Sequence, residues 1–396
     1  MAPNTLWKLK KAVYGLDDAG LKWYKRVVTV LQSWGGRKSE MDSAIFVFHS
    51  KEGELEGLVS VHVDDFFYCG GESFERVLQG IRDNLPVGKE KRGNFVYLGL
   101  SITTYTLKGV VYIEGSQQQY IESIQMNEVS SAARKEKSAR CDTLQHYHYR
   151  RIVGAMLWVT GQTRPDLAYD VCCLTMQLHE PKIKDLIKAN EVLKKMQKSV
   201  VNIKFGGLTV KNNPFKIIVF TDSSLGNGPN GSTMAGYIMY LTDGSAEDVE
   251  TDINANVLAW RSRKLRRVAR STFAAETLMA TDAIDATYPL QYLWMEVFGE
   301  RIRTECYTDC HSLYDHVHLH KQITEKRLLV EINSIRESIA TGELDDFKWI
   351  HSKAQYADGL TKCMVAWRII DSLMNARINL TEDWAGHTRT DRQPKS

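Results

Sequence analysis

Residues 216–222 read KIIVFTD, an apolar run that ends on an acid. A run of this kind, rich in β-branched residues, predicts a buried β-strand. Two shorter strand-like runs follow it, then a long helical pattern, another strand, two helices and a last strand. This order predicts a mixed five-stranded sheet with flanking helices, an α/β unit over about residues 209–366. The expected elements cover 216–220, 235–241, 257–260, 271–298, 302–308, 311–318, 325–340 and 347–351.

Aspartates stand at the ends of the predicted strands of this unit. Asp222 ends the first strand, Asp309 follows the strand at 302–308, and Asp358 follows the last strand at the start of a helix. A single aspartate in such a place is usually a helix N-cap. Three of them in one unit indicate a shared site, because strand ends are where a sheet protein gathers polar chemistry.

Glu276 lies within the long helical pattern, on the side that is expected to face inward. At about 100° per residue it shares a stripe with Ala280 and Ala283, whereas Asp282 and Asp285 lie on the opposite side. A carboxylate on the buried side costs several kcal/mol unless it is paired or binds a metal. Two explanations stay open: Glu276 pairs with an arginine of the preceding basic run, or it joins the aspartates around divalent cations.

Four convergent carboxylates suit two Mg²⁺ or Mn²⁺ ions about 4 Å apart. Such a pair activates a water and stabilises the leaving oxygen when a phosphodiester is hydrolysed. The basic run before Glu276 suits the backbone of a nucleic acid, although a solvated surface explains many such runs. Its cations are Arg261, Arg263, Lys264, Arg266, Arg267 and Arg270.

Two adjacent acids, Asp64 and Asp65, stand in the N-terminal part of the chain, within SVHVDDFFYCG at 60–70. An apolar and an aromatic run flank them, which predicts a tight hairpin with the acids at its tip. Residues 1–130 mix short strands and helical patterns, an α+β arrangement. The region 131–208 opens with a polar linker and is then mostly helical, and 367–396 is expected to be a tail.

Composition limits the protein classes that the chain can belong to. Its 396 residues are 43% apolar and 25% charged, which predicts a folded protein of two or three domains. The net charge of +3 predicts no partner by itself. No apolar run approaches the ~20 residues of a membrane span, and the start lacks a secretory signal, so an intracellular location, cytoplasmic or nuclear, is expected. The 7 cysteines are irregularly spaced, which predicts reduced thiols.

The acids and their surroundings resemble the RNase H domain of copia-type retrotransposon Pol polyproteins. The resemblance is carried by FTDSS (220–224), LAWRSRKLRRVARSTFAAET (258–277), CYTDCHSLYD (306–315) and QYADGLTK (355–362). It implies an RNase H-like fold and two Mg²⁺ or Mn²⁺ ions. The substrate that it implies is an RNA/DNA hybrid. Residue by residue, the family's metal-binding acids fall on Asp222, Glu276, Asp309 and Asp358.

The resemblance extends upstream to the reverse transcriptase of the same family. KLKKAVYGLDDAGLKWY (8–24), VHVDD (61–65), FVYLGLSI (95–102) and YRRIVGAMLWVTGQTRPD (149–166) carry it. It implies a palm and thumb in which Asp64 is a metal ligand and Asp65 supports it. His62 stands where the family usually has tyrosine. The family's first catalytic aspartate precedes the YGL segment, so the polymerase half is expected to be incomplete, and neither Asp17 nor Asp42 ends a strand that could replace it.

Three interpretations follow for the whole chain. The first is an RNase H-type endonuclease, with a nucleic acid and other products of the polyprotein as partners. The second is an inert relic that only binds nucleic acid, and the third is a chain whose true start lies further upstream. A zinc site among Cys306, Cys310, His311, His316, His318 and His320 is disfavoured because paired metal-ligand spacings are missing. Trp23 and Trp260 are candidates to face nucleic acid.

Overall fold

The computed structural model describes residues 13, 15–86, 88–208, 215–243, 252–319, 325–363 and 366–381. The chain divides into two compact units. The first comprises Met1–Arg92 with Pro289–Arg301, and the second comprises Gly93–Tyr288 with Ile302–Ser396. The domain limits expected at 130, 208 and 366 do not coincide with these units and stay predictions. Among the described residues, no helix is both long and apolar enough to cross a membrane.

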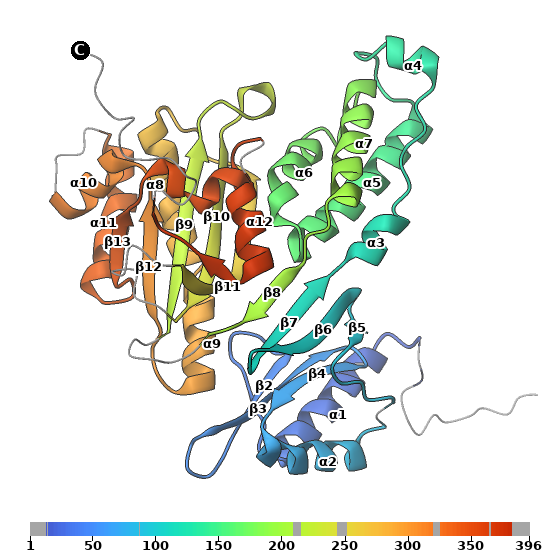
Figure 1. Ribbon diagram of the computed structural model, residues 1–396, viewed down its shortest axis with the longest axis vertical. Helices are drawn as coiled ribbons and strands as arrows, with labels where there is room; N and C mark the ends of the chain where they lie inside the picture. Colours follow the sequence, from blue (N-terminus) through green and yellow to red (C-terminus); the bar gives the residue numbers. More distant parts are fainter. Residues whose placement is uncertain are drawn as a thin grey trace, which may run out of the picture. The chain divides into compact units, whose positions relative to one another are not determined.

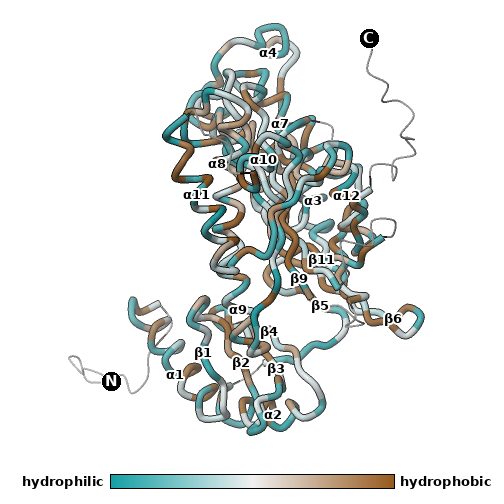
Figure 2. Tube along the Cα trace, turned by 90° about the vertical axis from the view of Figure 1, so that its left-hand side faces the viewer, coloured by the Kyte–Doolittle hydropathy of each residue, from teal (hydrophilic) through white to brown (hydrophobic). Residues whose placement is uncertain are grey.

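The first unit is built on a four-stranded antiparallel sheet with the order β1-β2-β3-β4. Hydrophobic side chains of this sheet form one core with those of two helices. Figure 2 colours the chain by hydropathy, and hydrophobic residues of β2 are brown in it. The predicted hairpin with the acids at its tip is confirmed. The elements are α1 (Ala19–Ser33), β1 (Arg37–Lys38), β2 (Ile45–His49), β3 (Leu55–His62), β4 (Asp65–Gly70), η1 (Glu72–Phe74) and α2 (Glu75–Asn84).

A distant segment of the chain completes the first unit. The helix expected over 271–298 is in fact two helices, α8 (Thr272–Asp285) and α9 (Tyr288–Phe298). Most of α9 packs with the first unit, where the Glu296 carboxylate accepts hydrogen bonds from the backbone N–H of Glu40 at 2.8 Å and from the Ser39 hydroxyl. Helical periodicity runs through the break, which is marked in the sequence by Pro289, a residue of the first turn of α9.

The second unit begins with a smaller sheet and a group of helices. The sheet has the order β5-β6-β7-β8, and all its pairs are antiparallel. The segment expected to be a linker holds a short helix, α4. The elements are β5 (Phe95–Tyr97), β6 (Leu100–Leu107), β7 (Val110–Ser116), α3 (Gln118–Ser123), α4 (Ser131–Lys135), α5 (Thr143–Gln162), η2 (Pro165–Leu167), α6 (Ala168–Thr175), α7 (Ile183–Lys198) and β8 (Ile203–Gly206).

The TRPD segment at 163–166 joins these helices through a buried arginine. Arg164 is fully buried and forms a two-pronged ion pair with Asp166, at 2.9 Å for each nitrogen. Its remaining N–H groups donate to the carbonyls of Met196 and Ser199 at the end of α7. A planar guanidinium suits such a site, because it can satisfy several acceptors at once. The segment therefore connects the end of α5 to the end of α7.

The predicted mixed sheet with flanking helices is confirmed, with one strand more than expected. Six strands have the order β13-β12-β9-β10-β11-β14, in which β12 runs parallel to β9 and β13, and the other pairs are antiparallel. The strands are β9 (Lys216–Ser224), β10 (Met234–Thr242), β11 (Ile253–Lys264), β12 (Arg303–Thr308), β13 (Asp346–Trp349) and β14 (Arg377–Ile378). The other elements are η3 (Pro229–Gly231), α10 (His311–Leu319), α11 (Lys326–Ala340), η4 (Ser352–Ala354), η5 (Tyr356–Leu360) and α12 (Trp367–Asn375).

Helices cover both faces of this sheet (Figure 1). Ile218 and Phe220 share a core cluster with Ile369 of α12 and with Leu360 of η5. Because side chains alternate along a strand, Ile217 and Val219 face the other side, where α8 packs against β9. Every residue of β9 is buried, including Asp222.

Candidate active site

The register of the parallel strands places Asp222 beside Asp309. Tyr307 of β12 is the register partner of Phe220 of β9, and in a parallel pair the partners advance together. Two residues further on, the same register sets Asp309 opposite Asp222. β12 has ended by then, whereas β9 continues to Ser224, so Asp222 lies inside its strand and not at the predicted end.

Glu276 approaches the two aspartates from α8. The helix begins after Ser271, whose hydroxyl caps it by accepting from the N–H of Ala274 at 3.1 Å. Glu276 Oε1 accepts a hydrogen bond from the backbone N–H of Ser223 at 3.1 Å. Its other oxygen, Oε2, is buried and has no hydrogen-bond partner. A buried carboxylate oxygen without a donor is the group that a cation would satisfy.

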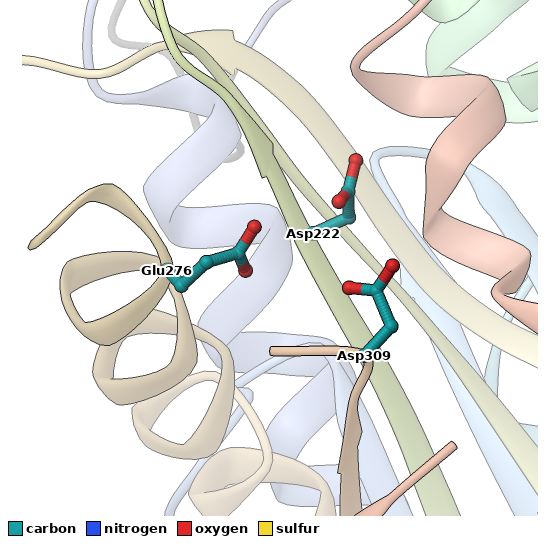
Figure 3. Close-up of side chains that lie close together, drawn as sticks. All are labelled: Asp222, Glu276 and Asp309. Carbon is teal, nitrogen blue, oxygen red and sulfur yellow. The ribbon is translucent and has the colours of Figure 1, made fainter. Parts of the chain in front are cut away.

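These three acids form one group (Figure 3). One carboxylate oxygen each of Asp222, Glu276 and Asp309 lies within 4.8 Å of the others. Asp222 is 1% exposed and Glu276 3% exposed. The structure thus brings three of the four predicted acids together, and the alternative pairing of Glu276 with an arginine of the basic run is not found in the described part of the chain.

Asp358 lies at the edge of this group, in the 3-10 segment η5. Lys362 Nζ is 2.5 Å from Asp358 Oδ1 and 3.5 Å from Asp222 Oδ2, so the lysine connects the two carboxylates. The hydroxyl of Thr361 donates a hydrogen bond to Asp222 Oδ2. Asp358 is therefore a neighbour of Asp222, although it does not belong to the group of three.

Burial and mutual repulsion weaken the acidity of the site. Burial raises the pKa of Asp222 to about 7, and the neighbouring Asp358 carboxylate contributes to the rise. Burial and the Asp222 carboxylate likewise raise the pKa of Glu276 far above its usual range. The pKa of Asp358 is also raised, chiefly by burial, against the opposing effect of Lys362. A bound divalent cation would lower these pKa values, because its positive charge favours the ionised carboxylates.

The residue types fit a hard divalent cation. Mg²⁺ and Mn²⁺ prefer carboxylate oxygens, and the three grouped acids offer only such oxygens. The strained approach of like charges and the unsatisfied Glu276 Oε2 both favour a bound cation. The site can therefore hold a divalent ion through Asp222, Glu276 and Asp309, with Asp358 close to it.

The basic run begins within β11 and continues into the loop before α8. Two of its six cations are engaged by acids of the same unit: Arg263 pairs with Asp282 of α8, and Arg267 pairs with Glu331 of α11. The other four are exposed. They are Arg261, Lys264, Arg266 and Arg270.

Asp64 and Asp65 lie at the tip of the β3–β4 hairpin and are exposed. The two-residue turn consists of Val63 and Asp64, and Val63 has a positive φ of 53°. A β-branched residue in this conformation is strained. The indole N–H of Trp23 donates to the Val63 carbonyl at 2.7 Å and supports the turn. Among the described residues, no further acid, histidine or cysteine joins the two aspartates in a metal-binding group.

The disfavoured zinc site is not formed by the described residues, and His320 lies outside them. Cys306 is fully buried within β12. Trp260 donates its indole N–H to the carbonyl of Thr160 at 2.8 Å, so its polar edge is engaged within the unit.

Sequence reasoning missed three residues that shape the site, namely Thr361, Lys362 and Gly236. Gly236 of β10 is the register partner of Asp222. A Cβ on Gly236 would lie 2.7 Å from the Cβ of Leu360, so only glycine allows η5 to approach β10 this closely. The spacing of four residues between Asp358 and Lys362 was the one available signal, since such pairs meet on a helical turn.

Comparisons with known proteins agree with the motifs. Residues 1–129 match the family model described as "Reverse transcriptase (RNA-dependent DNA polymerase)". The chain is 26% identical over 290 residues to the Retrovirus-related Pol polyprotein from transposon RE1 of Arabidopsis thaliana, a match that covers 69% of this chain and 18% of that polyprotein. It is 23% identical over 381 residues to the Retrovirus-related Pol polyprotein from transposon TNT 1-94 of Nicotiana tabacum, covering 90% of this chain and 27% of the relative.

Among solved structures, LC11-RNase H1 in complex with an RNA/DNA hybrid matches 37% of this chain and 93% of its own, with 17% identity and a TM-score of 0.27. The assignment of the fold therefore depends on the strand order described above. The predicted resemblance to retrotransposon Pol polyproteins is confirmed. The chain spans between 18% and 27% of the length of the two polyproteins named above.

Proposed function

We propose that the second unit is a ribonuclease H-type endonuclease, because the chain resembles retrotransposon Pol polyproteins and three carboxylates meet at its six-stranded sheet. It cleaves the RNA strand of RNA/DNA hybrids with the help of two divalent ions, Mg²⁺ or Mn²⁺. The observation that carries the proposal is the convergence of Asp222, Glu276 and Asp309, with the unsatisfied oxygen of Glu276 among them.

Each acid has a distinct part in this proposal. Asp222 presents its carboxylate from β9 and Asp309 from just after the neighbouring β12, and Glu276 closes the group from α8. Asp358, which shares Lys362 with Asp222, would help to hold a second ion. Bound ions would activate the attacking water and stabilise the oxygen that leaves. The residues of the chain hold this arrangement fixed, since Ser223 and Thr361 each bond one of the carboxylates.

Nucleic-acid binding is the second part of the proposal. The exposed cations Arg261, Lys264, Arg266 and Arg270 suit contacts with phosphates. The exposed face of α5 offers a complementary contact, because Trp158 is 45% exposed and the exposed Gly154 lies one turn before it. A flat aromatic side chain next to a residue without a side chain can approach a nucleic-acid groove closely.

The N-terminal unit is proposed to be a reverse-transcriptase palm region. Asp64 and Asp65 would be its metal-binding acids, carried on the strained hairpin tip. Within the described residues they lack a third ligand of the kind that the second unit assembles. The proposed hydrolytic activity is accordingly assigned to the second unit. An intracellular location and other products of the polyprotein as partners belong to the same proposal.

The test is strand-specific cleavage by the whole purified chain. A hybrid labelled on its RNA strand, a hybrid labelled on its DNA strand and a duplex DNA are each incubated with Mg²⁺. We expect cleavage of the RNA strand alone, abolished by Asp309→Asn and retained by Glu337→Gln, an exposed acid on α11. Binding of the hybrid without cleavage, at any Mg²⁺ or Mn²⁺ concentration, would instead support the inert relic.

A further inference from the structure

Lys362 occupies a position between two acids of the candidate active site. Its Nζ is 2.5 Å from Asp358 Oδ1 and 3.5 Å from Asp222 Oδ2. The backbone N–H of Lys362 also donates to the Asp358 carbonyl at 3.0 Å, so a single turn fixes the lysine relative to that acid. One positive charge of the chain itself therefore lies on the carboxylate pair that would share a second ion.

Glu276 and Asp309 differ from Asp222 and Asp358 in their charged partners. Neither Glu276 nor Asp309 forms an ion pair with a lysine or arginine in the described part of the chain. Glu276 Oε2 is buried without a hydrogen-bond partner. The group is thus asymmetric: Asp222 and Asp358 share a cation of the chain itself, Lys362, whereas Glu276 and Asp309 pair with no lysine or arginine of the described residues.

The side chain of Lys362 can also move away from the two carboxylates. Its side chain is 38% exposed, in contrast to 2% for that of Asp222. A lysine is a flexible chain with a compact charge, and it can reorient toward solvent without unfolding its surroundings. The neighbouring Thr361 keeps its own hydrogen bond to Asp222 Oδ2, so the acid would not lose all support when the lysine moves.

Building on the proposed two-ion hydrolysis, we infer that Lys362 is a tethered substitute for the second divalent ion. The chain binds one ion firmly at Asp222, Glu276 and Asp309. A second ion enters at Asp222 and Asp358 only when Lys362 withdraws, because the two cations repel each other and compete for the same oxygens. Lys362 is in this account a positioning residue that sets the Mg²⁺ concentration at which the second ion binds.

A purely structural role for the lysine makes a different prediction. If Lys362 only relieved the repulsion between two buried acids, its removal would lower stability and leave the binding of metal ions unchanged in number and affinity. The measurement must therefore count ions directly and must not depend on cleavage.

The experiment is a calorimetric and spin-resonance titration of the whole chain with Mn²⁺, without nucleic acid. We expect the wild type to bind one ion tightly and a second weakly. Lys362→Met should tighten the second ion at least about tenfold, since it removes a competing charge and leaves the carboxylates in place. Lys362→Arg, which keeps the charge, and Lys353→Met, an exposed lysine outside the group, should both resemble the wild type.

An unchanged second affinity in Lys362→Met overturns the inference, and so does a Lys362→Arg variant that behaves like Lys362→Met. A measurement on the wild type covers the case in which a variant fails to fold: acetylation of the Lys362 amine, followed by mass spectrometry, should accelerate as Mn²⁺ fills the second site. A constant rate contradicts it. If the wild type binds no Mn²⁺ and cleaves no hybrid, the proposed function falls as well; if it binds and cleaves while Lys362→Met is unchanged, only this inference falls.

Discussion

Replacing Asp222 by asparagine should stabilise the chain when no divalent ion is present. Burial and the nearby Asp358 raise the pKa of Asp222 from 3.8 to about 7. A folded-state pKa above the unfolded value means that the folded chain binds the proton more strongly. The ionised acid therefore costs stability, and this cost grows as the pH rises from about 4 to about 7 and is constant above that range.

The magnitude follows from the size of the shift. About three pKa units correspond to roughly 4 kcal/mol at 1.36 kcal/mol per unit, which is a ceiling. The variant also weakens the contact of Asp222 with Lys362, which offsets part of the gain. We therefore expect Asp222→Asn to raise the free energy of unfolding by about 1–3 kcal/mol at pH 8, and by nearly nothing at pH 4.

The assay is urea unfolding with a chelator at both pH values, followed by the same titration in excess Mg²⁺. Added Mg²⁺ should stabilise the wild type, because an ion that binds only the folded state adds RT ln(1 + c/Kd) to the free energy of unfolding, where c is the concentration of free Mg²⁺. Asp222→Asn should gain little stability from Mg²⁺. The difference in free energy of unfolding between the variant and the wild type should therefore shrink or change sign. The reasoning is refuted if the asparagine variant is the less stable of the two at pH 8 in chelator, or if Glu337→Gln reproduces its effect.

Three further substitutions test other parts of the account. Gly236→Ala should displace η5 from β10, because the new Cβ would lie 2.7 Å from Leu360 Cβ. We expect the free energy of unfolding to fall by about 1–3 kcal/mol and hybrid cleavage to be lost. Full cleavage activity would contradict the role given to this glycine. Arg164→Met should cost about 3–5 kcal/mol in urea unfolding, since it leaves the buried Asp166 without its partner, and a neutral result would show that the pair is dispensable. Trp158→Ala should weaken hybrid binding severalfold in a fluorescence titration while stability stays the same, and an unchanged affinity would remove α5 from the proposed interface.

The sequence predicted the acids of the site because simple geometry governs them. A buried strand with an acid near its end, followed by a second parallel strand with the same feature, sets Asp222 beside Asp309 through register alone. Helical periodicity placed Glu276 on the inward side of α8, and the structure buries it there. Local patterns of this kind survive in the fold because each depends on the alternation or rotation of a single element.

The features that were missed depend on contacts between distant segments. The packing of α9 in the first unit is one such feature, since the Glu296 carboxylate accepts a hydrogen bond there from the backbone N–H of Glu40. Arg263 and Arg267 of the basic run form ion pairs with acids of α8 and α11. Periodicity carries no information on such partners. The position of Lys362 likewise depends on how closely η5 lies on β10, which Gly236 decides.

Asp222, Glu276 and Asp309 are proposed to hold a divalent ion together. The most direct test is a crystal of the whole chain soaked in Mn²⁺, with anomalous scattering recorded at the manganese edge. We expect a manganese peak within coordination distance of all three carboxylates, and no such peak in Glu276→Gln crystals soaked in the same way. A clean map without a peak at these carboxylates, or a peak that survives in the variant at full height, would contradict the claim.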